Sequence, residues 1–283
     1  MRLPAFDPVD VAAVPTGAAE DVIGMLRDTT FLALTGAGMS TDSGIPDYRG
    51  PGSANRSPMS YQEFASGPGA QQRYWGRSYL GWTRMHHAEP NPGHVALARL
   101  EQQGICRGVV TQNVDGLHEQ AGTNLVVALH GRISDVVCLS CHGRIGRRSV
   151  QDRMRSLNPG WAARQQAGPL RPDGDVELDN TEGFRVPGCP TCGGPLKPDV
   201  VFFGENVPRH RVLTCYDLVE AAPALLVLGS SLTVMSGLRF VRAAAKRGVP
   251  VVIVNRGPTR GDPLATHRLD HGTSEFLTHP AWD

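Results

Sequence analysis

Short apolar runs rich in β-branched residues alternate with helical segments along most of this chain of 283 residues. Five such runs are followed or preceded by patterns of helical period, for example residues 93–103 and 237–247. Continuous apolar strands separated by helices are typical of a parallel sheet that is covered on both faces. We therefore predict an α/β fold with a Rossmann-like, doubly wound parallel sheet, with strands at 30–35, 108–111, 125–129, 224–229 and 249–255.

Ligands of such sheets bind beyond the carboxyl ends of the strands. The first predicted strand leads into TGAGMSTDSGIPDYRG, residues 35–50, which is rich in glycine but lacks the G-x-G-x-x-G spacing. Its backbone N–H groups can receive a pyrophosphate, although glycine-rich turns also serve tight packing alone. Asp47 and Arg49 lie in this loop and favour the ligand-binding interpretation.

Four further strand ends carry small or polar residues: TQNVDGLH at 111–118, His130-Gly131, Gly229-Ser230-Ser231 and Asn255-Arg256-Gly257. A histidine in this place can act as a general base near neutral pH, although a single histidine is more often structural. Asn113 or Asp115 can instead be a simple helix N-cap. The repetition of polar ends, more than any one of them, predicts a nucleotide site.

Four of the six cysteines form two C-x-x-C pairs, Cys138/Cys141 and Cys189/Cys192. Two such pairs can place four thiolates on one tetrahedral Zn²⁺, and a site with all four positions filled by protein is structural. The alternative is a redox pair or free core cysteines. The stretch 132–197 interrupts the α/β pattern, so we predict that it is an inserted zinc module of the zinc-ribbon type.

The stretch KPDVVFFGE, residues 197–205, is apolar with a proline near its start. It fits an edge strand that pairs with an extended peptide, and it fits an ordinary core strand about as well.

Composition and the lengths of the apolar runs bear on the cellular location of the protein and on the kinds of partner that it binds. The N-terminal stretch lacks a charged segment followed by a long apolar one, and no apolar run approaches the ~20 residues of a membrane span. We therefore expect a cytoplasmic protein that does not bind membranes. The formal net charge of +1 gives no reason to expect nucleic-acid binding.

Together these motifs resemble sirtuins, which are NAD-dependent protein-lysine deacylases, over roughly residues 20 to 278. GAGMSTDSGIPDYRG, TQNVDGLH, the LHG around His130, the C-x-x-C pairs, KPDVVFFGE, GSSL and VNRG occur in the sirtuin order. RYWGRSYLGW, LNPGW, PDGDVEL and GPTRGD further resemble the class II, mitochondrial-type sirtuins and their bacterial relatives.

The resemblance implies a discontinuous large NAD-binding domain at 1–50, 91–131 and 198–283, and a small domain at 51–90 and 132–197. It implies one structural Zn²⁺ on the four paired cysteines and NAD as co-substrate. The residues that would bind NAD are Gly36, Ala37, Gly38, Ser40, Asp47, Tyr48, Arg49, Gln112, Asn113, Val114, Asp115, Gly229, Ser230, Ser231, Asn255, Arg256, Gly257 and Thr273.

The resemblance also implies the reaction. The acyl oxygen of an acyl-lysine protein or peptide attacks the ribose carbon as nicotinamide leaves, and the acyl group ends on ADP-ribose. His130 would be the general base, and Asn113 a second catalytic residue. Val201, Phe202, Gly204 and Glu205 would contact the substrate. Two alternatives are a protein ADP-ribosyltransferase and a non-catalytic module that binds NAD or ADP-ribose.

Tyr74 and Arg77 have the Tyr-x-x-Arg spacing of the desuccinylating sirtuins. Residues i and i+3 share a helix face, and an arginine with a phenol can bind a carboxylate. The sequence thus raises the hypothesis of a longer or carboxylated acyl group, with a packed Tyr74 and a solvated Arg77 as the alternative.

Overall fold

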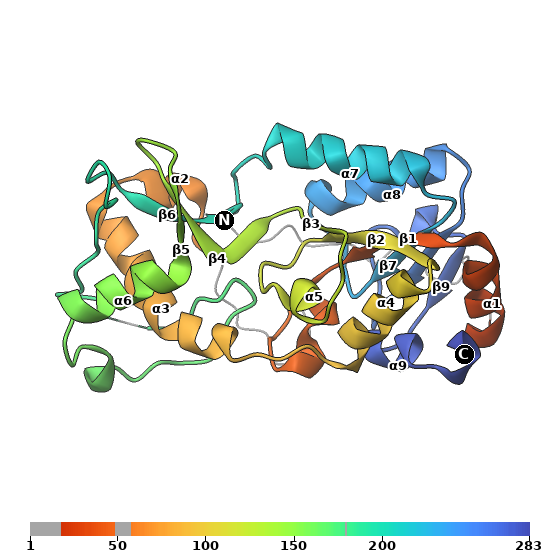
Figure 1. Cartoon of the computed structure of the whole chain (residues 1–283), viewed down its shortest axis with the longest axis horizontal. Helices are drawn as coiled ribbons and strands as arrows, with labels where there is room; N and C mark the ends of the chain where they lie inside the picture. Colours follow the sequence, from red (N-terminus) through yellow and green to blue (C-terminus); the bar gives the residue numbers. More distant parts are fainter. Residues whose placement is uncertain (1–17, 49–57, 179) are drawn as a thin grey trace.

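The computed structural model describes residues 18–48, 58–178 and 180–283. Figure 1 shows two parts of unequal size, each built around its own sheet. In the larger part, six parallel strands are arranged in the order β3-β2-β1-β7-β8-β9. They span β1 (Phe31–Thr35), β2 (Cys106–Thr111), β3 (Val126–Ala128), β7 (Leu225–Leu228), β8 (Val251–Val254) and β9 (His267–Leu269). The expected parallel sheet is confirmed, and β9 is a strand that the apolar runs do not reveal.

Alternation of side chains along the strands explains why helices cover both faces. Phe31 and Ala33 of β1 pack on one face and Leu32 and Leu34 on the other, and all four are buried. The first face is covered by α1 (Ala19–Thr29), α4 (Pro92–Gln102) and α9 (Thr273–Leu277), and the second by α7 (Arg209–Ala221) and α8 (Met235–Lys246). A short helix, α5 (Leu117–Gln120), follows β2.

The smaller part contains an antiparallel sheet in the order β5-β4-β6. Its strands are β4 (Gly131–Cys138), β5 (Arg144–Gly146) and β6 (Leu196–Val200), and its helices are α2 (Tyr61–Ala65), α3 (Pro68–His86) and α6 (Arg147–Leu157). The aromatic residues of α3 lie in its core, and the guanidinium of the fully buried Arg147 lies 5.1 Å from the ring centroids of both Trp75 and Trp82. In the described part of the chain, no helix is long and apolar enough to cross a membrane.

The candidate active site at the strand ends

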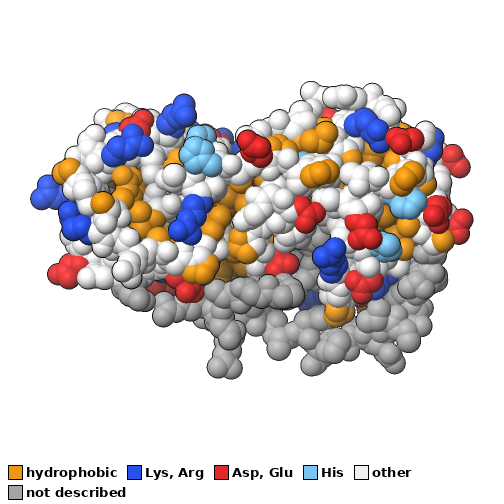
Figure 2. All heavy atoms as spheres, turned by 90° about the horizontal axis from the view of Figure 1, so that it is seen from below, with side chains coloured by type: hydrophobic (Ala, Val, Ile, Leu, Met, Phe, Trp, Pro, Cys, Tyr) orange, Lys and Arg blue, Asp and Glu red, His pale blue; other side chains and the backbone are white. Residues whose placement is uncertain are grey.

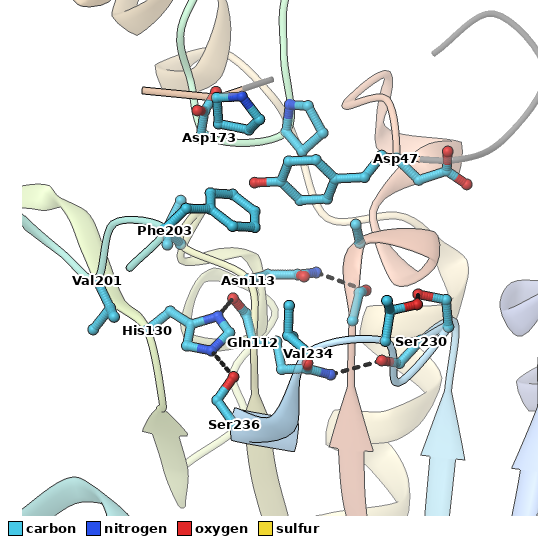
Figure 3. A pocket seen from close by; sticks show the side chains of 18 of the residues that line it. Asp47, Gln112, Asn113, His130, Asp173, Val201, Phe203, Ser230, Val234 and Ser236 are labelled. Atoms are coloured by element: carbon cyan, nitrogen blue, oxygen red, sulfur yellow. Dashed lines mark hydrogen bonds between the residues drawn. The ribbon is translucent and has the colours of Figure 1, made fainter. Parts of the chain in front are cut away.

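A cavity of about 1260 Å³ lies where the carboxyl ends of β1, β2, β3, β7 and β8 meet segments of the smaller part. Seen from below, the surface is hollowed between two rounded parts, and hydrophobic side chains gather in that hollow (Figure 2). Figure 3 shows polar side chains from several strand ends that face one another across the cavity. The expected convergence of strand ends is therefore present.

Glycines allow the loops after β1 and β7 to cross at backbone contact. A Cβ on Gly38 would lie 2.9 Å from the Cα of Gly229, and one on Gly229 would lie 2.5 Å from the backbone nitrogen of Met39. Gly229 also has a φ of +60°, a left-handed conformation that disfavours other residues. The Gly38 N–H donates to the Gly229 carbonyl at 2.9 Å. Because these glycines have no side chains, the two loops pack backbone against backbone where they line the cavity.

Asn113, Asp115 and Ser40 form a connected polar group on one wall. The Asn113 amide donates to the Gly36 carbonyl and to Ser40 Oγ, both at 3.0 Å, and the Ser40 hydroxyl donates to Asp115 Oδ2 at 2.7 Å. Asp115 Oδ1 also accepts the Leu117 N–H at the start of α5, so it takes part in the helix capping considered above. Burial raises the pKa of Asp115 above its ordinary value.

Two further strand ends are tied by side-chain amides. Gln112 Nε2 donates to Ser230 Oγ at 2.8 Å, which joins the ends of β2 and β7. Asn255 Nδ2 donates to the carbonyls of Arg256 and Gly257, so the turn after β8 is closed by its own asparagine.

His130 follows β3 and is bonded at both ring nitrogens. Its Nδ1 lies 2.9 Å from the Gln112 carbonyl oxygen and its Nε2 2.8 Å from Ser236 Oγ (Figure 3). Burial lowers the pKa of His130 to about 4, so the imidazole is neutral near pH 7. A neutral imidazole with one nitrogen facing the cavity is suited to accept a proton.

The segment after β6 is a closed turn more than a free edge. β6 ends at Val200, and Phe202 N–H donates to Glu205 Oε2 at 2.9 Å, while Glu205 N–H donates back to the Phe202 carbonyl at 3.0 Å. The Tyr61 N–H donates to the Phe203 carbonyl at 2.9 Å. The expected strand over the whole of 197–205 is thus wrong beyond residue 200, because Glu205 folds the backbone onto itself.

Tyr74 and Arg77, which were expected to bind an acyl carboxylate, have different surroundings in the structure. Tyr74 lines the cavity but is 4 % exposed and packs on Phe64 and Phe202. Arg77 does not line the cavity, and its Nε lies 3.0 Å from Oδ2 of the buried Asp175. The i, i+3 spacing is correct for a shared helix face, but a partner 98 positions away occupies the arginine.

The four paired cysteines converge in the smaller part. Their sulfur atoms all lie within 4.8 Å of one another, with 3.5 Å between Cys138 and Cys192 and 3.8 Å between Cys141 and Cys189. Ligands about 2.3 Å from a tetrahedral Zn²⁺ lie ~3.8 Å apart, so the cluster has the size that zinc needs. Backbone N–H groups of Ser140 and Cys141 point at Cys138 Sγ, which favours a thiolate. Cys106 and Cys215 are buried elsewhere.

Most residues expected to bind cofactor or substrate line this cavity, and of those that the structure describes two do not. Thr273 does not line the cavity but contacts the cavity-lining loop after β1, where its hydroxyl donates to the Gly38 carbonyl at 3.4 Å. Arg77 is held by Asp175, and Arg49 lies outside the described residues. The expected residues that line it are Gly36, Ala37, Gly38, Ser40, Asp47, Tyr48, Tyr74, Gln112, Asn113, Val114, Asp115, His130, Val201, Phe202, Gly204, Glu205, Gly229, Ser230, Ser231, Asn255, Arg256 and Gly257.

Sequence reasoning missed Asp173 and Ser236 as cavity residues. Asp173 lies in an irregular segment and Ser236 in the first turn of α8, and both line the cavity. Asp173 stands in the PDGDVEL stretch, which resembles a class II insertion that could approach the acyl site, but none of its residues is singled out by its local pattern. The position of Ser236 after the GSSL strand end was the available signal.

Comparison with known proteins gives a consistent result. The Sir2 family model matches residues 36–236. "NAD-dependent protein deacetylase 1" of Mycobacterium avium is 49% identical over 92% of this chain and 94% of its own length. The protein of the same description in Streptomyces coelicolor is 52% identical over 91% of this chain and 88% of its own length.

Solved structures agree in fold. A Sir2 structure with a p53 peptide and NAD⁺ has a TM-score of 0.74 and 31% identity, and covers 92% of this chain and 96% of that one. A Sir2 structure bound to a propionylated peptide has a TM-score of 0.71 and 29% identity, with the same coverage.

Proposed function

This chain belongs to the Sir2 family and is an NAD-dependent protein deacetylase, and we propose the roles that its own residues take in that reaction. The observation that carries the assignment of roles is the neutral His130 beside the Asn113–Ser40–Asp115 group in one cavity. NAD supplies an electrophilic ribose carbon when nicotinamide is the leaving group. The residues of this chain bind it, orient it and move the proton.

The cavity fits a dinucleotide and a peptide side chain together. Its volume of about 1260 Å³ exceeds the ~300–1,000 Å³ of common small-molecule sites. The thin crossing at Gly36, Gly38 and Gly229 offers backbone at the place where a phosphate would lie, and a Cβ at any of the three would collide with the opposite loop. We assign Ser230, Ser231 and Asn255 to the nucleotide's phosphate and ribose groups.

Asp115 and Asn113 are assigned to the nicotinamide end. The Asp115 carboxyl is a hydrogen-bond acceptor for an amide N–H when ionised, and a donor as well when protonated. Burial raises its pKa, which favours the protonated form relative to an exposed aspartate. Asn113 holds Ser40 and the Gly36 carbonyl, which fixes the floor on which the leaving group would rest.

His130 is assigned as the general base. Its pKa of about 4 keeps Nε2 unprotonated throughout the neutral range. The imidazole would take the proton of a ribose hydroxyl, so that this oxygen could attack the acyl carbon and the bond from that carbon to the lysine nitrogen would break, which releases the lysine amine. The acyl-lysine would reach this point past Val201 and Phe202, with Tyr48 and Phe203 in edge-to-face contact at 5.9 Å between ring centroids.

The acyl group is proposed to be neutral instead of carboxylated. Of the described residues near Tyr74, Asp173 presents a carboxyl to the cavity, whereas Arg77 and Arg171 are paired with Asp175 and Glu177 and do not line it. An acyl carboxylate that reached Tyr74 would meet the Asp173 carboxyl, whose pKa burial raises above its ordinary value, and neither Arg77 nor Arg171 would be there to pair with it. Asp173→Asn is expected to raise glutaryl-peptide turnover relative to acetyl-peptide turnover by about 5-fold or more, whereas a ratio that stays constant would contradict this assignment.

The four-cysteine cluster holds the structural Zn²⁺ in this proposal, and residues 51–90 and 132–197 form the small domain around it. A cytoplasmic location is proposed because thiolate ligands require a reducing compartment.

The test is nicotinamide release from NAD with acetyl, propionyl, succinyl and glutaryl peptides. Release that requires an acyl peptide, and that is followed by lysine deacylation, is expected for wild type. His130→Ala should lower deacylation by at least about 100-fold. Retained transfer of ADP-ribose to a protein acceptor in that variant would instead favour the transferase. Bound NAD with no peptide-dependent release would favour a non-catalytic module.

A further inference from the structure

Ser236 contacts the ring nitrogen that the reaction requires. Its Oγ lies 2.8 Å from Nε2 of His130, and both side chains line the cavity (Figure 3). Ser236 is the second residue of α8, which follows the β7 end through residues 229–234. A Cβ on Gly237 would lie 2.6 Å from Gln112 Oε1, so the absence of a side chain there lets the start of α8 approach the end of β2.

The hydrogen-bond pattern fixes which nitrogen carries the proton. The Gln112 carbonyl oxygen 2.9 Å from Nδ1 can only accept, so neutral His130 carries its proton on Nδ1. Its Nε2 is then an acceptor, and the Ser236 hydroxyl must donate to it. Ser236 therefore occupies the lone pair that acts as the base.

The surroundings of His130 all bear on its charge. Burial lowers its pKa, the Gln112 carbonyl raises it, and the Arg211 guanidinium of α7 lowers it. Arg211 is itself paired with Asp199 at 2.8 Å, and Asp199 also pairs with Arg144 of β5. The positive end of the α8 dipole adds to the terms against an imidazolium. The Ser236 hydroxyl donates to Nε2 of the neutral ring, and on an imidazolium it would have to rotate and accept from Nε2–H instead.

We propose that Ser236 is a positioning residue for the general base, and this rests on the proposed role of His130. In the substrate-free cavity its hydroxyl holds the imidazole in the Nδ1–H tautomer with Nε2 directed at the cavity. When a ribose hydroxyl arrives, it replaces Ser236 at Nε2 and gives up its proton there. The serine hydroxyl thus keeps the base oriented until the substrate takes its place.

The test compares Ser236→Ala with Ser236→Thr, which keeps the hydroxyl. The direct readout is the pKa of His130 from NMR titration of its imidazole in the protein without NAD. Alanine is expected to raise that pKa by about 0.5–1 unit, because one hydrogen bond to the neutral form is lost. Threonine is expected to restore it. No difference between alanine and wild type would overturn the proposal.

Kinetics supply the second readout. The pH profile of kcat/KM reports the free enzyme and that of kcat the substrate complex. Ser236→Ala is expected to shift the acid limb of kcat/KM upward and to leave the limb of kcat in place, because substrate has already replaced the serine. Equal shifts in both profiles would overturn the replacement step. A shifted NMR pKa with unchanged profiles would refute His130 as the base and leave its bond to Ser236 intact.

Folding is controlled separately. If Ser236→Ala melts too early for titration, Ser236→Cys replaces it, since a thiol of similar size is a weaker donor. An intermediate rise in the His130 pKa is then expected, and a pKa equal to that of wild type would overturn the proposal.

Discussion

Arg77→Ala separates a structural arginine from a ligand-binding one. The Asp175 side chain is 3 % exposed and that of Arg77 21 %, with 3.0 Å between Arg77 Nε and Asp175 Oδ2. Removing one partner of a buried pair costs roughly 3–5 kcal/mol, because the other charge is left without compensation. Arg77 is partly exposed and Arg171 also favours the Asp175 charge, so we expect the lower figure, about 3 kcal/mol at pH 8.5.

The loss should depend on pH in a defined direction. Burial raises the pKa of Asp175 to about 7, and Arg77 opposes that rise. A carboxyl group whose pKa is higher in the folded than in the unfolded state contributes to folding stability. This contribution is fully present below the unfolded-state pKa and is lost as pH rises through the folded-state pKa. Without Arg77 the folded pKa moves above 7, so stability continues to fall beyond that pH. We expect a loss of about 1 kcal/mol at pH 6 and about 3 kcal/mol at pH 8.5.

Urea denaturation at both pH values measures the effect. Arg84→Ala is the matched control, because Arg84 lies on the same helix and donates at 2.8 Å to the Gly168 carbonyl, and it pairs with no buried carboxylate among the described residues. It should cost less than about 1 kcal/mol at either pH. An Arg77→Ala protein as stable as wild type at pH 8.5, with selectively lost turnover of a glutaryl peptide, would refute the reasoning and restore the carboxylate-binding role.

Two further predictions concern stability. Chelation that removes the metal from the four-cysteine cluster should lower the melting temperature by roughly 10 °C, because Cys138 and Cys189 belong to the core that contains Trp75. Added Zn²⁺ should restore the melting temperature and added Mg²⁺ should not. An unchanged melting temperature of the metal-free protein would argue against a structural metal. Burial lowers the pKa of His94 to about 4, so folding stability should fall by about 3 kcal/mol as pH falls from 6.5 to 4, because the unfolded histidine gains a proton in that range. His94→Gln should flatten this pH dependence of stability in urea titrations. The same dependence of stability on pH in the variant and in wild type would contradict the prediction.

The parts of the fold that sequence could predict are those with local signals. Continuous apolar runs such as Leu225–Leu228 identify buried parallel strands because every side chain packs against a helix layer. The polar strand ends follow from the same reasoning, since a charged or amide group directly after such a run lies at one edge of the sheet. The cysteine spacing predicts its cluster because C-x-x-C geometry is set by one turn.

The missed features depend on pairs that are distant in sequence and lie in irregular chain. The segment that carries Asp173 and Asp175 shows no helical or strand periodicity in its apolar residues. It is irregular in the structure and lies close to α3. A Cβ on Gly81 would lie 2.2 Å from the Gly174 carbonyl oxygen, and Gly174 has a φ of +75°. Nothing in the sequence around either glycine indicates that the two lie in contact, so the pairing of Arg77 with Asp175 could not be predicted from the residues near Arg77.

The same limit explains why the chemistry of His130 was only half predictable. Its place after a strand identifies a candidate base, but its pKa is lowered chiefly by burial, with opposing effects of the Gln112 carbonyl and of Arg211 on α7, and Ser236 of α8 contacts its Nε2. A histidine with the carbonyl alone would be drawn toward imidazolium, and one with the arginine alone would have no fixed tautomer. The role that we propose for this residue as a base therefore depends on how α7 and α8 pack over the strand ends, which only the folded arrangement shows.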